Sequence, residues 1–105
     1  VLMAGVTYKP DVADLRAAAP LRLLRHLHQA RAELAWHDPV LSVIPKALSA
    51  IPRSMALKMP DGAPPAAIIL GTPHRAFDLV AISRAAPVVF DPFGILPAGP
   101  NVIVV

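Results

Sequence analysis

Apolar residues form short runs along the chain, and polar or turn-forming segments separate these runs. Residues 1–6, VLMAGV, form a continuous apolar run, which is typical of a strand buried on both faces of a sheet. Similar runs predict further strands at 33–37, 55–59, 66–70, 87–90 and 101–105. Four of the last five residues are β-branched, a composition that favours the extended backbone.

Segments with helical spacing of apolar residues separate these strands. Pro20 suits the first turn of a helix, and apolar positions recur from there at helical spacing to about Arg31. Shorter helices are expected at 43–51 and 77–85. Apolar strands that alternate with helices predict an α/β layer fold with a mainly parallel sheet, in a single domain.

The composition narrows the class of protein. The chain has 105 residues, of which 55% are hydrophobic and 16% charged, compared with a usual charged share of about 25%. Such a chain can bury a core, which excludes a disordered tail. Every apolar run is shorter than the roughly 18 residues that a membrane span needs, so we expect no membrane partner. The expected location is cytoplasmic. The chain opens without a polar lead-in, which indicates a start inside a longer protein.

Charge and cysteine content exclude several functions. The net charge of +3 comes from ten Lys and Arg against seven Asp and Glu, and the densest cationic stretch, 22–31, is expected to be a solvated helix face. We therefore expect no nucleic-acid partner. The absence of cysteine excludes disulfides, thiolate metal sites and a cysteine nucleophile. The four histidines lack the spacing of metal ligands and no GxSxG motif is present, so we expect no metal and no catalytic residue.

Polar residues cluster where the predicted strands end, at 7–9, 37–38, 72–74 and 91. In parallel sheets, ligands bind outside the carboxyl ends of the strands, near the start of helices. Lys9 and Arg16 lie in such a loop and suit an anionic ligand such as a diphosphate. The alternative is that they merely pair with Asp11 and Asp14. No GxGxxG or GK[ST] phosphate loop is present.

Residues 5–16, GVTYKPDVADLR, followed by Pro20, resemble the opening of the C-terminal domain of nucleotide-sugar 6-dehydrogenases, the UDP-glucose, UDP-N-acetylhexosamine and GDP-mannose dehydrogenases. The resemblance continues through AWHDP at 35–39, AIILGTPH at 67–74 and VVFD at 88–91. It thus spans nearly the whole chain, in order. It implies a three-layer Rossmann-like sandwich in which residues 1–105 form the nucleotide-sugar-binding domain of a longer dehydrogenase.

This family oxidises a sugar C6 alcohol to a carboxylate in two NAD-dependent steps, through a thiohemiacetal on a cysteine. By resemblance, Tyr8 and Lys9 contact the nucleotide-sugar, and Arg16 reaches the NAD held by an N-terminal domain. Asp11 and Asp14 would brace the loop and orient Lys9 and Arg16. The implied partners are a UDP-sugar, or its GDP counterpart, and the N-terminal and central domains of a homo-oligomeric parent. The isolated chain should not turn over substrate.

Two departures from the family pattern bear on function. The family's serine before Pro20 is Ala19 here, which removes a possible helix cap worth about 1 kcal/mol. In many members of the family, the strand that ends at the position of Asp91 is followed by an arginine that touches substrate, whereas this chain has Pro92-Phe93-Gly94. This replacement keeps open a degenerate, non-catalytic assembly or binding module of the same fold.

Residues at the ends of the predicted strands provide further site candidates and bear on one competing fold. Further candidates at the same sheet edge are His37, Asp38, Thr72 and His74. A signalling receiver-like domain would need an acidic pair after the first strand, where this chain has Thr7-Tyr8-Lys9.

Overall fold

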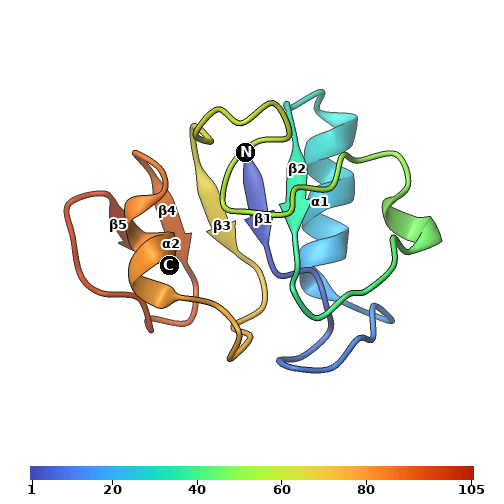
Figure 1. The fold of residues 1–105 in the computed structure, drawn as a ribbon, viewed down its shortest axis with the longest axis horizontal. Coiled ribbons are helices and arrows are strands. Elements are labelled where there is room, and N and C mark those ends of the chain that lie inside the picture. The colour runs from blue at the N-terminus through green and yellow to red at the C-terminus, as the bar shows by residue number, and fades with distance from the viewer.

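The fold is a five-stranded, all-parallel sheet with helices on both faces, as Figure 1 shows. It is seen in a computed structural model that describes residues 1–105. The strand order across the sheet is β2-β1-β3-β4-β5. The strands are β1 (Leu2–Ala4), β2 (Ala35–His37), β3 (Ile68–Leu70), β4 (Val89–Asp91) and β5 (Val102–Val104). The helices are α1 (Ala19–Gln29) and α2 (Leu79–Arg84), with a single 3₁₀ turn, η1 (Lys46–Leu48).

A hydrophobic cluster lies on each face of the sheet, between the sheet and a helix. The helix α1, the sheet and the helix α2 therefore form three layers. Successive strand residues point to opposite faces, so Leu2 joins one cluster and Met3 the other. Leu21 and Leu24 of α1 pack in the cluster with Met3, while Ile82 of α2 packs in the cluster with Leu2. The predicted α/β, Rossmann-like single domain is therefore confirmed.

The first strand is shorter than the apolar run that predicts it, because the chain turns at Gly5. Gly5 has φ +87°, a left-handed conformation that glycine adopts without strain. The next amide, Val6 N–H, donates to the Asp38 carboxylate instead of continuing the ladder. The apolar run thus continues for two residues beyond the strand, and Val6 packs in the cluster with Met3.

Two of the predicted elements between β2 and β3 are wrong. Residues 55–58 form a series of bends and Met59 has no regular structure, because the Ser54 hydroxyl shares its one proton between the Lys58 and Ala56 carbonyl oxygens and curls the chain. The pairing with β2 lies earlier, in a single bridge between Arg53 and Trp36. The helix expected at 43–51 is only the η1 turn, which begins after Pro45.

The helix α1 begins one residue earlier than expected, at Ala19, and Pro20 lies in its first turn as predicted. The capping position is therefore Ala18, which is buried and has no side-chain cap, so a serine at position 19 would lie inside the helix. Beyond Gln29 the chain leaves the helix at Arg31, which has φ +62°. There Arg31 N–H and Ala32 N–H donate back to the His28 and Leu27 carbonyl oxygens.

All five strands point the same way, so their carboxyl ends meet at one edge of the sheet. The loops 5–18, 38–45 and 71–78 follow from this edge, at the bottom of Figure 1. The sheet face beside α1 is only partly covered, and a groove of about 290 Å³ there is lined by Leu23, Ile69, Phe90, Pro92 and Val105. No helix has the length and apolar character needed to cross a membrane.

Candidate functional site

The strand order places a topological switch point between β1 and β3. The chain leaves β1 towards β2 on one side and later returns to β3 on the other, so the connections that begin at β1 and at β3 lead to opposite sides of the sheet. In doubly wound parallel sheets with this order, the ligand crevice lies outside the carboxyl ends of these two strands. The segments at this crevice are the loop after Ala4 and the turn after Leu70, which carry the sequence-predicted candidates.

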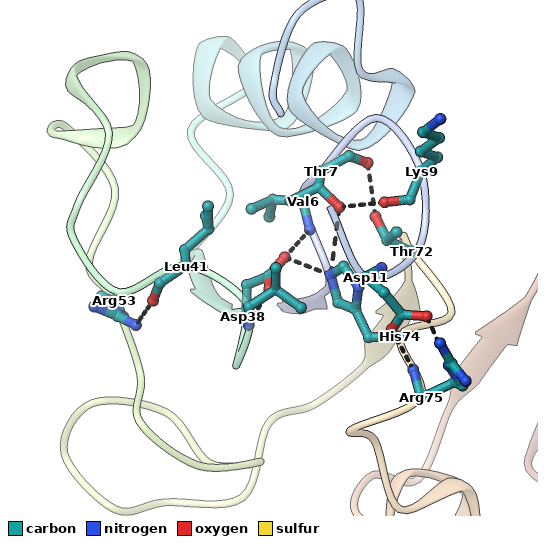
Figure 2. A network of polar contacts seen from close by, with 11 residues as sticks. Val6, Thr7, Lys9, Asp11, Asp38, Leu41, Arg53, Thr72, His74 and Arg75 are labelled. Atoms are coloured by element: carbon teal, nitrogen blue, oxygen red, sulfur yellow. Dashed lines mark hydrogen bonds and ion pairs between the residues drawn. The ribbon is translucent and has the colours of Figure 1, made fainter. Parts of the chain in front are cut away.

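The β1–α1 loop closes on itself and presents two of these candidates to solvent. The Tyr8 amide donates to the Asp14 carbonyl oxygen at 2.6 Å, which brings the two ends of the loop together. Tyr8 is 58% exposed, and Lys9 is exposed beside it. The Lys9 ammonium has no hydrogen-bond or ion-pair partner, and its side chain points away from the buried contacts in Figure 2.

Arg16 pairs with Asp14, as expected from the alternative that the two cations of the loop pair with its two aspartates. The guanidinium donates from Nε and Nη2 to the two carboxylate oxygens at 3.2 and 3.0 Å, while the side chain stays 91% exposed. The side-chain and backbone hydrogen bonds from Arg16 lower the pKa of Asp14, and the charge of Lys9 lowers it further. Asp14 is therefore paired with Arg16, while Lys9 acts on it only through its charge and forms no ion pair with it.

Asp11 does not pair with Lys9, and that part of the alternative interpretation is wrong. Its carboxylate accepts the Arg75 backbone N–H at 2.8 Å and the Arg75 Nε–H at 3.1 Å. The backbone hydrogen bond from Arg75 is the main reason that the pKa of Asp11 is lowered. Sequence reasoning missed Arg75, because the pair joins loops 64 residues apart and only its position after His74 hinted at it.

A buried polar network lies beneath this loop, as Figure 2 shows. Three of the further candidates belong to it, Asp38 after β2 and Thr72 and His74 after β3. The Thr72 hydroxyl donates to the Thr7 carbonyl oxygen at 2.8 Å, and the Thr7 hydroxyl donates to the Lys9 carbonyl oxygen at 3.0 Å. The turn after β3 therefore holds the start of the β1–α1 loop.

Asp38 is the charged centre of this network, with its side chain fully buried. Burial raises the pKa of the Asp38 carboxyl, but hydrogen bonds from His74, Val6 N–H and Val40 N–H outweigh this effect and lower the pKa overall. The side chain is therefore a carboxylate held by three donors. His37, the remaining candidate, hydrogen-bonds the Ser54 carbonyl oxygen and lies against Phe77, so its contacts are structural.

The loop after β4 completes this edge. Asp91 is buried and accepts backbone N–H donors from Phe93 and Gly94 on one oxygen and from Leu96 on the other. These bonds fix Phe93, which is 46% exposed and lines a groove of about 230 Å³ together with Ala19, Pro20 and Gly71. Phe93 thus lies beside the first turn of α1.

The fold and this edge define a doubly wound α/β domain with the exposed cations Lys9 and Arg16 in the loop at its switch point. The sequence profile of the UDP-glucose/GDP-mannose dehydrogenase family, UDP binding domain, matches residues 2–98, and the chain belongs to this family. No curated protein and no solved structure matches the chain. Receiver domains share the strand order, but here β1 is followed by Thr7-Tyr8-Lys9 in place of an acidic pair.

Proposed function

We propose that this chain binds the nucleotide part of a nucleotide-sugar, with UDP-sugars as the expected class. In this proposal it is the C-terminal domain, over residues 1–105, of an NAD-dependent 6-dehydrogenase that oxidises the sugar C6 alcohol to a uronate. The family membership supports the nucleotide-binding role directly. The longer parent chain, with N-terminal and central domains, and its cytoplasmic, homo-oligomeric state are what the resemblance further implies.

The observation that carries this proposal is the unpaired Lys9 ammonium at the switch point. Arg16 and Arg75 are committed to Asp14 and Asp11, and Arg53 is committed to the Leu41 carbonyl oxygen and to the ring of Trp36. Lys9 has no such partner, so binding an anion there breaks no existing ion pair. A diphosphate beside Lys9 would leave the adjacent Tyr8 ring free to contact the base or ribose.

Arg16 is proposed to contact NAD presented by the N-terminal domain of the parent chain. Two of its guanidinium nitrogens are anchored on Asp14, which fixes the plane of the group, and Nη1 makes no hydrogen bond. An oriented, exposed guanidinium fits a phosphate offered from across an interdomain cleft. NAD would supply the hydride acceptor, and this chain would supply the fixed cation. The catalytic cysteine and the glycine-rich NAD loop would lie outside these residues.

A nuclear magnetic resonance titration tests the nucleotide-binding role. We expect UDP to shift the amide resonances of Tyr8, Lys9 and Asp14 while leaving those of the opposite edge, such as Asp61 and Gly62, unchanged. A parallel titration with GDP shows whether the domain distinguishes uracil from guanine. An absence of shifts in the β1–α1 loop at millimolar UDP and GDP would contradict the proposal.

A second candidate is a non-catalytic assembly or binding module of the same fold. Phe93 favours it, because an apolar ring occupies the place where the family resemblance leads one to expect a substrate-binding arginine. The coding sequence on the amino side of Val1 discriminates between the two. A GxGxxG strand–helix unit and a cysteine in an intervening domain support the dehydrogenase, while their absence supports the module.

A further inference from the structure

The hydrogen bonds of His74 select one tautomer of its buried imidazole. Nδ1 lies 2.9 Å from the Asp11 backbone N–H, which can only donate, so Nδ1 accepts and carries no proton. The proton of the neutral ring is therefore on Nε2. Nε2 lies 2.9 Å from Asp38 Oδ2 and 3.4 Å from the Thr7 hydroxyl oxygen, and both can accept it.

Asp38 holds this tautomer from the far side of the ring. Its Oδ2 accepts from Val6 N–H and from His74 Nε2–H, and its Oδ1 accepts from Val40 N–H. An oxygen that faces Nε2 favours a proton on that nitrogen and leaves Nδ1 free to accept. The tautomer thus follows from the fixed position of the Asp38 carboxylate after β2.

Asp11 is the point where this network reaches the β1–α1 loop. Its amide is bound by His74 Nδ1, and its carboxylate is bound by Arg75, the next residue. Asp11 has φ +63°, a left-handed conformation that is uncommon for non-glycine residues, although aspartate adopts it more readily than most, and these contacts stabilise it. Lys9 and Tyr8 precede Asp11 by two and three residues, so they extend from this fixed point.

We propose that Asp38 and His74 are positioning residues that set Tyr8 and Lys9 for the nucleotide by holding Asp11 on His74 Nδ1. This inference rests on the proposed function, because it assigns the network a role at the same site. Neither side chain is exposed, so both act through the loop and not by touching the ligand. Hydrogen bonds join the Asp38 carboxylate to the His74 imidazole and the imidazole to the Asp11 amide, and the backbone leads from Asp11 to Lys9 and Tyr8.

Two amide variants of His74 separate the two ends of the ring. In His74→Asn the side-chain oxygen can replace Nδ1 as the acceptor for Asp11, but the side chain is too short to reach Asp38. In His74→Gln the longer side chain can replace Nε2 as the donor to Asp38, but Asp11 loses its acceptor. Both variants remove the ring and one hydrogen bond. A purely structural role of His74 would therefore make the two variants equally weak in UDP binding.

Affinity for UDP distinguishes a positioning role from a structural one. We expect His74→Gln to weaken UDP binding about tenfold relative to His74→Asn, the size of effect that one lost hydrogen bond gives. Both are measured at a temperature where circular dichroism shows them folded. Equal affinities in the two variants would overturn the positioning role.

The tautomer is tested on the unaltered chain, which needs no variant to fold. A long-range ¹H–¹⁵N spectrum should show His74 protonated at Nε2 and unprotonated at Nδ1. The opposite tautomer, or a ring protonated at both nitrogens at neutral pH, would overturn the inference.

Failure of the proposed function remains distinguishable from failure of this inference. If the unaltered chain binds neither UDP nor GDP, the nucleotide-binding proposal falls. The positioning of the loop is then measured by hydrogen exchange, in which the Asp11 amide should be protected in the unaltered chain and in His74→Asn and unprotected in His74→Gln. Equal protection in the two variants would overturn the inference.

Discussion

Gly5 lies against the backbone of Thr72, so closely that a Cβ on Gly5 would stand 2.5 Å from the Thr72 carbonyl oxygen and 2.7 Å from its amide nitrogen. This contact joins the exits of β1 and β3, the two strands that flank the switch point. A side chain at position 5 would push these exits apart. The close approach is therefore a structural requirement for the site as well as for the sheet.

Gly5→Ala should destabilise the fold strongly. We expect a loss of about 3 kcal/mol or more, because the added methyl meets backbone atoms and the residue must keep a positive φ. Gly62→Ala is the matched control, since Gly62 has φ +89° with no atom within 4 Å of the added Cβ. It should cost only about 1 kcal/mol. Urea unfolding of both variants measures the difference, and equal losses would contradict the close approach.

The gathering of the polar residues 7–9, 37–38, 72–74 and 91 at the carboxyl edge of the sheet could be predicted from the sequence, because each of these groups lies at the end of an apolar run. The contacts within that edge could not. The pairing of Asp11 with Arg75 and the burial of His74 depend on how the loops after β1 and β3 fold over one another. Such long-range geometry leaves no periodic signal along the chain.

Local chemistry explains the two wrongly predicted elements. Residues 55–59 have the apolar content of a strand, but the Ser54 hydroxyl satisfies carbonyl oxygens that a strand would have offered to a neighbour. The segment 43–51 has helical spacing, but Pro45 is extended at ψ 146° and leaves room for only one 3₁₀ turn. In both places a single side chain overrides the hydrophobic pattern.

The start of α2 provides a test of local stability. The Asp78 side chain accepts the Ala81 N–H at 3.1 Å and caps the helix. Asp78→Ala should lower the free energy of unfolding by about 1 kcal/mol, whereas Asp78→Asn keeps an acceptor and should stay close to the unaltered chain. Thermal unfolding measures both. A loss in the asparagine variant as large as in the alanine variant would contradict the capping role.

The buried Asp38 predicts acid sensitivity. Because its pKa is lowered in the folded state, its contribution to stability is present above the unfolded value of about 4 and is lost as pH falls through the lowered folded value. Asp11 and Asp14 act in the same direction. Asp38→Asn should be less stable at pH 7 and lose less stability on acidification. A variant that loses stability with pH as steeply as the unaltered chain would contradict the assignment.

Phe93 lies where the family resemblance leads one to expect a substrate-binding arginine, and the effect of this replacement can be tested. If the nucleotide lies beside the first turn of α1, Phe93→Arg should strengthen UDP binding about tenfold by adding a charge-assisted hydrogen bond. Ile95→Arg adds the same charge at a position 43% exposed in the same loop and is the control. Calorimetry measures both affinities. No gain at position 93, or an equal gain at position 95, would contradict a ligand at this place.

The central claim is that Lys9 binds the nucleotide anion, and calorimetric titration of UDP into Lys9→Met tests it most directly. Lys58→Met removes an equal charge from an exposed residue in the loop that precedes β3 and serves as the control. The account predicts that Lys9→Met weakens UDP binding tenfold or more, about the value of one hydrogen bond to a charged group, while Lys58→Met leaves it unchanged. Equal affinities in the Lys9→Met and Lys58→Met variants would contradict it.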